Sequence, residues 1–184
     1  MLIVFSGVSA SGKNTIMKEL ENRLENLFIL TESTATTRPP RESDSEFNTY
    51  KFMSNDEFEK MIDNNQFFEF ENVHGYYYGT IKDAIEKAAN DKNNFFMRDI
   101  DVHGHKKLKS HYKDKVVSIF LDAPDEILRE RLALRGEDED RINVRLSRGE
   151  LERQHKGDYD LVINNLDKEK TIEIICEYLK LLNN

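Results

Sequence analysis

The stretch LIVFSGVSASGKNTIMKEL, residues 2–20, decides the fold. It begins with the apolar run 2–5, whose length suits a buried strand, and passes directly into a loop that contains Gly7, Gly12 and Lys13. Glycine lets the backbone of such a loop curl, so that consecutive N–H groups point inward at an anion.

The residues after the loop predict a helix, because apolar side chains recur there at spacings of four, four and three. These residues are Ile16, Leu20, Leu24 and Leu27. A strand, a glycine loop and a helix in this order form the context of a phosphate-binding loop, with the anion at the positive end of the helix. Lys13 would then reach the outer phosphates.

The loop departs from the pattern GxxxxGK[ST] at its magnesium ligand. Asn14 occupies the hydroxyl position, and Thr15 follows one residue late. When the loop is considered alone, an ordinary strand-to-helix turn with an exposed lysine is the alternative.

Composition restricts the class of protein. The 184 residues suffice for one compact domain, and a net charge of −8 with a pI near 5.2 gives no broad basic field for a nucleic acid polymer or an acidic membrane. No apolar run approaches the roughly 20 residues of a membrane span, and the N-terminus lacks a secretory pattern. We therefore expect a cytoplasmic protein that meets anionic ligands with local clusters of Arg and Lys.

Cysteine and histidine do not indicate a reactive or metal-binding centre. Cys176 lies among apolar residues at helical spacing, which indicates core filling. His103 and His105 form the only close histidine pair, and no third ligand accompanies them, so we expect no metal site there.

Strands alternate with helices along the rest of the chain. Three apolar segments predict further core strands: FFMRDID (95–101), KVVSIFLDA (115–123) and YDLVINN (159–165). A closing amphipathic helix is expected at 167–182. This alternation argues for an α/β fold with a three-layer core, in which helices cover both faces of a parallel sheet.

The first of two excursions from this core is expected at residues 33–83. Ser54 and Glu57 form a capping-box pattern for a short helix, and QFFEFENVHGYYYGT (66–80) predicts a hairpin. Thr80 is expected to cap the following helix.

The second excursion is expected at residues 125–156. It is helical in propensity, dense in Arg, Glu and Asp, and interrupted by Gly136, while Pro124 suits the start of its first helix. The core then consists of residues 1–32, 84–124 and 157–184, and the whole chain forms one folding unit.

The first excursion concentrates guanidinium and hydroxyl groups: Thr34, Thr36, Thr37, Arg38, Arg41, Tyr50, Tyr77 and Tyr78. Arginine matches phosphate oxygens bidentately, and tyrosine hydroxyls can donate to the remaining oxygens. The set predicts a monophosphate pocket, with solvated charges in a polar loop as the alternative.

Several motifs behind the glycine loop carry a resemblance, in this order: TATTRPPR (34–41), FEFENVHGYYYGT (68–80), DIDVHG (99–104), RERLALRG (129–136) and RINVRLS (141–147). Together they resemble the guanylate kinase family over nearly the whole chain. The resemblance implies transfer of the terminal phosphoryl group of ATP to GMP with Mg²⁺, giving ADP and GDP in purine nucleotide metabolism. It also implies a P-loop core with a mixed β/α GMP-binding excursion and a helical lid.

The resemblance assigns roles by position. Catalytic roles fall on Lys13, Arg38, Arg135 and Arg145. ATP binding falls on Gly7, Ser9, Ala10, Ser11, Gly12, Lys13, Asn14, Thr15 and Arg131. GMP binding falls on Thr34, Arg38, Arg41, Tyr50, Glu69, Tyr78, Gly79, Thr80, Asp99 and Asp101. Metal binding falls on Asn14, Thr15 and Asp99.

The role implied for Glu69 agrees with guanine chemistry. Guanine presents N1–H and its 2-amino group side by side, and one carboxylate can accept from both. Adenine has no such donor pair, so a buried Glu69 would be left without donors and AMP rejected. Asp99 and Asp101 have an alternative reading as solvated acids at a strand end.

Some positions depart from the family pattern. Ala10 and Ser11 replace a customary glycine and small apolar residue, Thr34 replaces Ser, and His103 stands where Gln is frequent. The segment after Arg41 lacks the usual glycine-rich turn. The family contacts adenine near the positions of Asn164 and Asn165. Four further arginines are interpreted as helix-surface charge: Arg129, Arg141, Arg148 and Arg153.

Two other functions are compatible with parts of the pattern. A guanylate-kinase-like binding module would keep the fold but tend to lose Lys13, Arg135 and Arg145, which are present here. A sister P-loop kinase acting on another small phosphate would have no use for Glu69. Either a monomer or a homodimer is compatible with the sequence.

Overall fold

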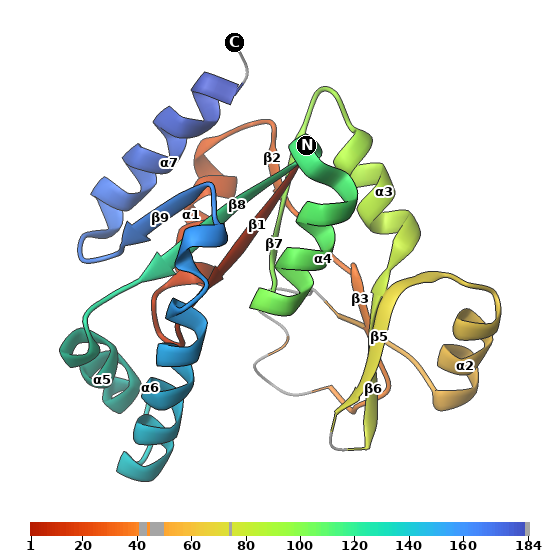
Figure 1. Ribbon diagram of the computed structural model, residues 1–184, viewed down its shortest axis with the longest axis horizontal. Coiled ribbons are helices and arrows are strands. Elements are labelled where there is room, and N and C mark those ends of the chain that lie inside the picture. Colours follow the sequence, from red (N-terminus) through yellow and green to blue (C-terminus); the bar gives the residue numbers. More distant parts are fainter. Residues whose placement is uncertain (41–43, 45–49, 74, 183–184) are drawn as a thin grey trace.

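The computed structural model describes residues 1–40, 44, 50–73 and 75–182 (Figure 1). Its strands are β1 (Leu2–Gly7), β2 (Leu27–Ile29), β3 (Thr34–Thr36), β4 (Tyr50–Phe52), β5 (Phe67–Val73), β6 (Tyr76–Ile81), β7 (Phe95–Asp99), β8 (Val116–Asp122) and β9 (Leu161–Asn164). Its α-helices are α1 (Lys13–Arg23), α2 (Asn55–Asp63), α3 (Lys82–Asn90), α4 (Val102–Tyr112), α5 (Asp125–Leu134), α6 (Glu139–Arg153) and α7 (Lys168–Leu182). The 3-10 helices η2 (Lys113–Lys115) and η3 (Lys156–Asp158) follow α4 and α6.

A five-stranded parallel sheet forms the centre, in the order β2-β7-β1-β8-β9. Every residue of β8 is buried, as are the first five of β1. Continuous apolar runs of this kind are needed because both faces of the sheet are covered. The predicted parallel sheet is confirmed.

Helices cover both faces of the sheet (Figure 1). On one face, α1 and α7 bury a cluster that includes Phe5, Leu20 and Ile175, with Cys176 packed partly buried against it. On the other face, α3 and α4 bury Ile85 and Leu108 against β1 and β8. The three-layer core is therefore confirmed, and Cys176 packs against it as predicted.

A second sheet, in the order β4-β3-β6-β5, projects beside the core and carries α2 (Figure 1). The predicted hairpin is β5 with β6, which pair antiparallel. The predicted capping box is present, because Ser54 accepts from the backbone of Glu57 and Glu57 accepts from the backbone of Ser54. Phe58 of α2 stacks on Phe67 at 4.3 Å between ring centroids, which anchors the helix to the sheet.

Helices α5 and α6 pack together on the other side of the molecule (Figure 1). Pro124 is the N-cap of α5, and Gly136 has a φ of 78°, so the chain turns between the helices where glycine was expected to break them.

Two local predictions are wrong. Helix α1 ends at Arg23, with Leu24 as its C-cap, and Leu27 begins β2 instead of extending the helix. Thr80 lies inside β6 and pairs with β3, so Ile81 is the N-cap of α3 and supplies no side-chain hydrogen bond. Within the described residues, no helix combines the length and apolar character needed to cross a membrane.

Candidate functional site

The loop between β1 and α1 has a backbone that favours very small residues. Gly7 has a φ of 139°, and a Cβ there would lie 1.9 Å from the carbonyl oxygen of Leu121. Gly12 has a φ of 94°, and a Cβ there would lie 2.5 Å from Nδ2 of Asn165. Ala10 has a φ of 64°, a left-handed conformation that costs a residue with a Cβ about 1 kcal/mol. Backbone geometry thus explains why glycine is customary at that position.

Helix α1 begins without a side-chain cap. Gly12 is its N-cap, and its first turn contains no acidic residue, so the first N–H groups are available to an anion. Nζ of Lys13 donates to the carbonyl oxygen of Gly7 at 2.8 Å, which holds the ammonium group over the loop. The loop therefore has the form that the sequence predicts for phosphate binding.

Side chains from the C-terminal half of the chain support this loop. Asn165 donates from Nδ2 to the carbonyl oxygen of Ser11 at 2.8 Å, and its Oδ1 accepts from Thr171 at 3.0 Å. Arg131 donates to the carbonyl oxygens of Ala10 at 3.3 Å and of Asn165 at 2.8 Å. Arg131, predicted to bind ATP, thus braces the loop backbone in this structure.

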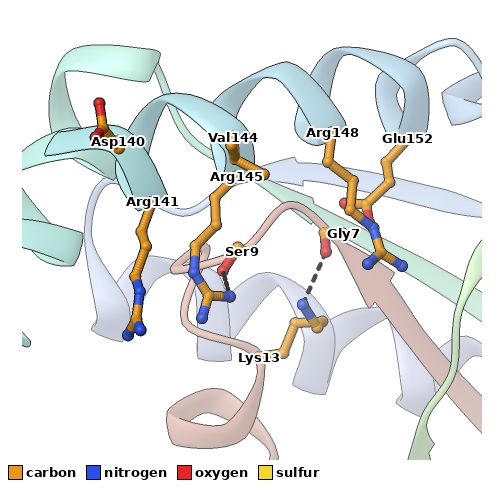
Figure 2. A pocket seen from close by; sticks show the side chains of 9 residues that line it. All are labelled: Gly7, Ser9, Lys13, Asp140, Arg141, Val144, Arg145, Arg148 and Glu152. Carbon is orange, nitrogen blue, oxygen red and sulfur yellow. Dashed lines mark hydrogen bonds and ion pairs between the residues drawn. The ribbon is translucent and has the colours of Figure 1, made fainter. Parts of the chain in front are cut away.

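A cavity of about 630 Å³ lies between the loop and α6 (Figure 2). It is lined by Gly7, Ser9, Lys13, Asp140, Arg141, Val144, Arg145, Arg148 and Glu152. In Figure 2 three arginines project from α6 toward the loop, and Lys13 faces them from α1. We name this space the loop cavity. Because four cationic groups outnumber two carboxylates, it suits a polyphosphate.

The arginines of α5 and α6 differ in their positions. Arg145 donates from Nη1 to Oγ of Ser9 at 3.0 Å and forms an ion pair with Glu137. Arg141 and Arg148, interpreted as helix-surface charge, are exposed and also line the loop cavity. Arg135 is exposed beside the end of α5 and does not line the cavity. The structure brings Arg145 to the loop but not Arg135.

A second cavity of about 250 Å³ adjoins the first, and we name it the acid cavity. It is lined by Ser6, Gly7, Lys13, Tyr50, Asp99, Ile100, Asp101, Val102 and Glu152. Gly7, Lys13 and Glu152 line both cavities. Asp99 and Asp101 therefore face a common space with Lys13, in contrast to solvated acids at a free strand end.

The acids of this cavity differ in their surroundings. Desolvation raises the pKa of Asp99 although its side chain remains open to the cavity, and Lys13 and Arg98 oppose that shift. Desolvation also raises the pKa of Glu152, against the opposing charge of Lys13. Asp101 caps α4 by accepting from the N–H of Gly104 at 2.8 Å.

Four residues predicted to bind GMP form one row across the second sheet. Thr34 of β3 pairs with Tyr50 of β4 on one side and Thr80 of β6 on the other, and Thr80 pairs with Glu69 of β5. Directly paired residues present their side chains on the same face. The sheet register thus gathers hydroxyl groups and a carboxylate from segments up to 46 positions apart, as between Thr34 and Thr80.

Gly79 has a packing role on the opposite face. A Cβ there would lie 2.7 Å from the ring of Phe67 and 2.9 Å from that of Phe58. Glycine at this position lets the aromatic side chains approach the strand.

Arg38, predicted to bind phosphate, is 6% exposed and already holds a carboxylate. Its Nη1 and Nη2 each donate to one oxygen of Asp44 at 2.7 Å, and its guanidinium carbon lies 4.9 Å from the ring centroid of Tyr50. The ring of Tyr50 meets that of Tyr78 edge-on at 6.4 Å. The carboxylate of Asp44 thus occupies the fork that a phosphate would use. Arg41 lies outside the described residues.

Three charged residues that sequence reasoning missed or misread have defined partners. Lys107 of α4 lies 2.7 Å from Oε2 of Glu69. Arg98 of β7 is 5% exposed and donates to Oγ1 of Thr34 at 3.2 Å. Arg153, interpreted as surface charge, instead donates from Nε to both carboxylate oxygens of Asp122, at 3.1 and 3.0 Å. Nothing in the local sequence separates Lys107 and Arg153 from ordinary surface charges, whereas Arg98 lies in a segment that the sequence predicts to be a buried strand.

The predicted metal ligands supply oxygen donors. Asn14 and Thr15 are exposed on the first turn of α1, beside Lys13. Across the described part of the chain, no group of three or more His, Cys, Asp or Glu residues could hold a metal ion by itself. Mg²⁺ usually takes one or two protein oxygens and completes its shell with phosphates and water, so these donors fit it.

Known proteins resemble this chain along almost its whole length. The profile of the family described as guanylate kinase matches residues 1–182. A guanylate kinase of Wolinella succinogenes is 36% identical over 176 residues, which cover 95% of this chain and 80% of the relative. A guanylate kinase of Helicobacter pylori strain ATCC 700392 / 26695 is 39% identical over 183 residues, covering 98% and 87%. The crystal structure of guanylate kinase from Anaplasma phagocytophilum has a TM-score of 0.72 at 28% identity and covers 100% of this chain and 85% of that chain.

Proposed function

Because this chain belongs to the guanylate kinase family and has its function, we propose that the two cavities hold the two nucleotides of the reaction ATP + GMP = ADP + GDP. The observation that carries the proposal is the position of Lys13, which lines both cavities. A lysine between a polyphosphate and a monophosphate neutralises charge where the phosphoryl group transfers.

The loop cavity takes the phosphates of ATP in this proposal. The phosphates contact the N–H groups at the start of α1, the loop backbone and Lys13 on one side of the cavity. Arg145 approaches them from α6 on the other side. Phosphoryl transfer requires little covalent chemistry of the protein, so positioning and charge neutralisation are the main tasks.

The acid cavity and the row on the second sheet take GMP. Arg38, Arg41, Tyr50 and Tyr78 hold its phosphate, while Thr34, Glu69, Thr80 and Asp101 read guanine. Arg38 exchanges the carboxylate of Asp44 for the phosphate, since both present two oxygens to the same fork. Asp99 stays near Lys13, where the phosphoryl group passes.

Mg²⁺ belongs to the proposal as the partner of ATP. Asn14 and Thr15 would hold it through their oxygens, with Asp99 as a further candidate. When bound, the ion neutralises phosphate charge and orients the transferred group.

Residues 33–83 and 125–156 act as the two moving parts, a GMP-binding arm and a lid. Closure of the lid brings Arg145, Arg148 and Arg135 toward the phosphates and keeps water from the phosphoryl group. The proposal includes a cytoplasmic location, a monomer or homodimer, and no nucleic acid polymer or membrane as partner.

A coupled assay of ADP formation tests the proposal. The full chain is supplied with ATP, Mg²⁺ and each nucleoside monophosphate in turn, and turnover with GMP alone is expected. Glu69→Gln should lose at least about 10²-fold in kcat/KM for GMP, because a carboxylate that accepts two donors is replaced by a group that accepts one. Glu71→Gln, on the same strand, is the matched control. No turnover with GMP would favour a binding module, and equal turnover with AMP would refute the role of Glu69.

A further inference from the structure

Glu69 lies against α4 through a specific contact. Nζ of Lys107 is 2.7 Å from Oε2 of Glu69, and Oε1 lies 3.2 Å from the position of a Cβ added at Gly104. Glycine at 104 therefore leaves room for the carboxylate. The side chain of Lys107 is 60% exposed and that of Glu69 23% exposed, so both groups are open to a ligand.

The pair presents a defined pattern of donors and acceptors. An ionised carboxylate has about four acceptor positions, so one bond to an ammonium group leaves positions on both oxygens for other donors. An ammonium group has three donors, and only one of those of Lys107 is needed for Glu69. The pair thus offers a donor beside two acceptors.

One edge of guanine is complementary to this pattern. It presents O6 as an acceptor, followed by N1–H and the 2-amino group as donors. When the two donors meet the two oxygens of a carboxylate, O6 lies next to the oxygen that faces N1. A cation bonded to that oxygen is therefore within reach of O6.

We propose that Lys107 is a specificity-determining residue that holds Glu69 and donates a hydrogen bond to O6 of guanine. This inference rests on the proposed function, in which Glu69 reads guanine. Adenine carries an amino donor in place of O6, and that donor would face the ammonium group. Lys107 thus adds a repulsive element against AMP to the attractive one for GMP.

Two other cationic residues near this site, Lys106 and Arg98, contact groups other than Glu69. Lys106, the preceding residue of α4, is 3.3 Å from Asp158 and 3.0 Å from Nδ1 of His155. Arg98 is buried and bonds Thr34. The hydrogen bond and charge of Glu69, with further charge from Glu71 and Asp101, raise the pKa of Lys107, which keeps its ammonium group protonated.

Base analogues test the assignment. In 6-thio-GMP, sulfur replaces O6 and accepts hydrogen bonds poorly, while N1–H and the 2-amino group remain. IMP keeps O6 and N1–H but lacks the 2-amino group. We would measure kcat/KM for GMP, 6-thio-GMP and IMP with the unmodified enzyme, Lys107→Met, Lys107→Arg and the control Lys106→Met, after circular dichroism has shown that each variant is folded.

The unmodified enzyme should prefer GMP to 6-thio-GMP by about 10- to 100-fold, the scale of one hydrogen bond from a charged donor. Lys107→Met should lower kcat/KM for GMP by that factor, mainly through KM, and bring the GMP to 6-thio-GMP ratio close to one. Its GMP to IMP ratio should stay unchanged, because Lys107 does not meet the 2-amino group. Lys107→Arg should restore part of the preference, and Lys106→Met should match the unmodified enzyme.

An unchanged GMP to 6-thio-GMP ratio in Lys107→Met would overturn the inference. An equal loss for all three nucleotides would also overturn it, since Lys107 would then only orient Glu69. Absence of GMP turnover by the unmodified enzyme, or an unaffected Glu69→Gln variant, would instead overturn the proposed function, and the two failures are therefore distinguishable.

Discussion

Arg145 of α6 donates from Nη1 to Oγ of Ser9 across 3.0 Å, so α6 contacts the loop between β1 and α1 directly. Ser9 lies between Gly7 and Lys13, both of which line the loop cavity. The guanidinium group therefore lies at the cavity where we place the phosphates of ATP. If the Arg145 side chain exchanged the hydroxyl of Ser9 for a phosphate oxygen, its guanidinium group would contact the transferring phosphoryl group.

Arg145→Ala should lower kcat by at least about 10³-fold, the scale of an arginine that stabilises the transferring phosphoryl group. The dissociation constant of GMP should change by less than about twofold, because Arg145 contacts the loop and not the second sheet. Steady-state kinetics and calorimetric titration of GMP measure the two quantities. Arg129→Ala is the control, since Arg129 pairs with Glu139 and Asn143 outside both cavities. Weakened GMP binding at normal turnover would show that Arg145 binds GMP and does not stabilise the transferring phosphoryl group.

Asn14→Ser should lower the Mg²⁺ concentration required for half-maximal turnover by about two- to tenfold. A hydroxyl oxygen at this position matches the usual P-loop ligand, whereas the amide of Asn14 is a longer side chain on an exposed helix turn. The measurement is a Mg²⁺ titration at saturating ATP and GMP. An unchanged Mg²⁺ requirement would mean that Thr15 or water already supplies the oxygen ligand. Thr15→Val would then distinguish Thr15 from water.

Parts of the core and of the second sheet could be predicted from the sequence because their signals are local. The buried run of β8 and the capping box of Ser54 depend on neighbouring residues, and both appear as expected. The end of α1 was missed because Leu24 and Leu27 continue the helical spacing. Leu24 is instead the C-cap of α1, and Leu27 is the first residue of β2, which pairs with β7.

The site could be predicted in part because its motifs reflect family resemblance, whereas the roles of single charges depend on distant partners. Arg153 reads as one more arginine of a polar helix, yet its partner Asp122 lies 31 positions earlier, at the end of β8. The partner of Lys107 of α4 is Glu69, on β5 of the second sheet. No spacing within the sequence encodes such pairs, because each forms only when elements distant in the sequence pack together.

Arg98→Met should leave the protein equally stable or raise its free energy of unfolding by about 1–2 kcal/mol. Arg98 is 5% exposed, and its Nε and Nη1 have no hydrogen-bond partner among the described residues. Desolvation lowers its pKa to about 10, so the guanidinium group remains charged at pH 7 at a cost to the folded state. Urea unfolding at pH 7 measures the change, with Arg98→Lys, which keeps the charge, as the control. If the free energy of unfolding of Arg98→Met fell by more than about 1 kcal/mol, the attraction of Arg98 to Glu69, Asp99 and Asp101 would outweigh the cost of its unpaired N–H groups.

Asp122→Asn should lower the free energy of unfolding by about 2–3 kcal/mol at pH 7, because Asp122 is 3% exposed and its charge is matched by Arg153 and Lys156. Burial opposes ionisation of Asp122, but hydrogen bonds from Arg153, Lys156 and the N–H of Ala123 outweigh it and hold its pKa below the usual range.

A carboxylate with a depressed pKa in the folded state contributes stability that is complete above its unfolded pKa, about 3.9, and is lost as the pH falls through its folded pKa. The difference between Asp122→Asn and the unmodified protein should therefore stay constant from pH 7 to about pH 5 and shrink below about pH 4. Urea unfolding at pH 7, 5, 4 and 3 measures it. Asp125→Asn, which removes a half-exposed partner of Arg153, should cost less than about 1 kcal/mol at every pH. A difference that persists undiminished at pH 3 would mean that the asparagine perturbs packing and not charge.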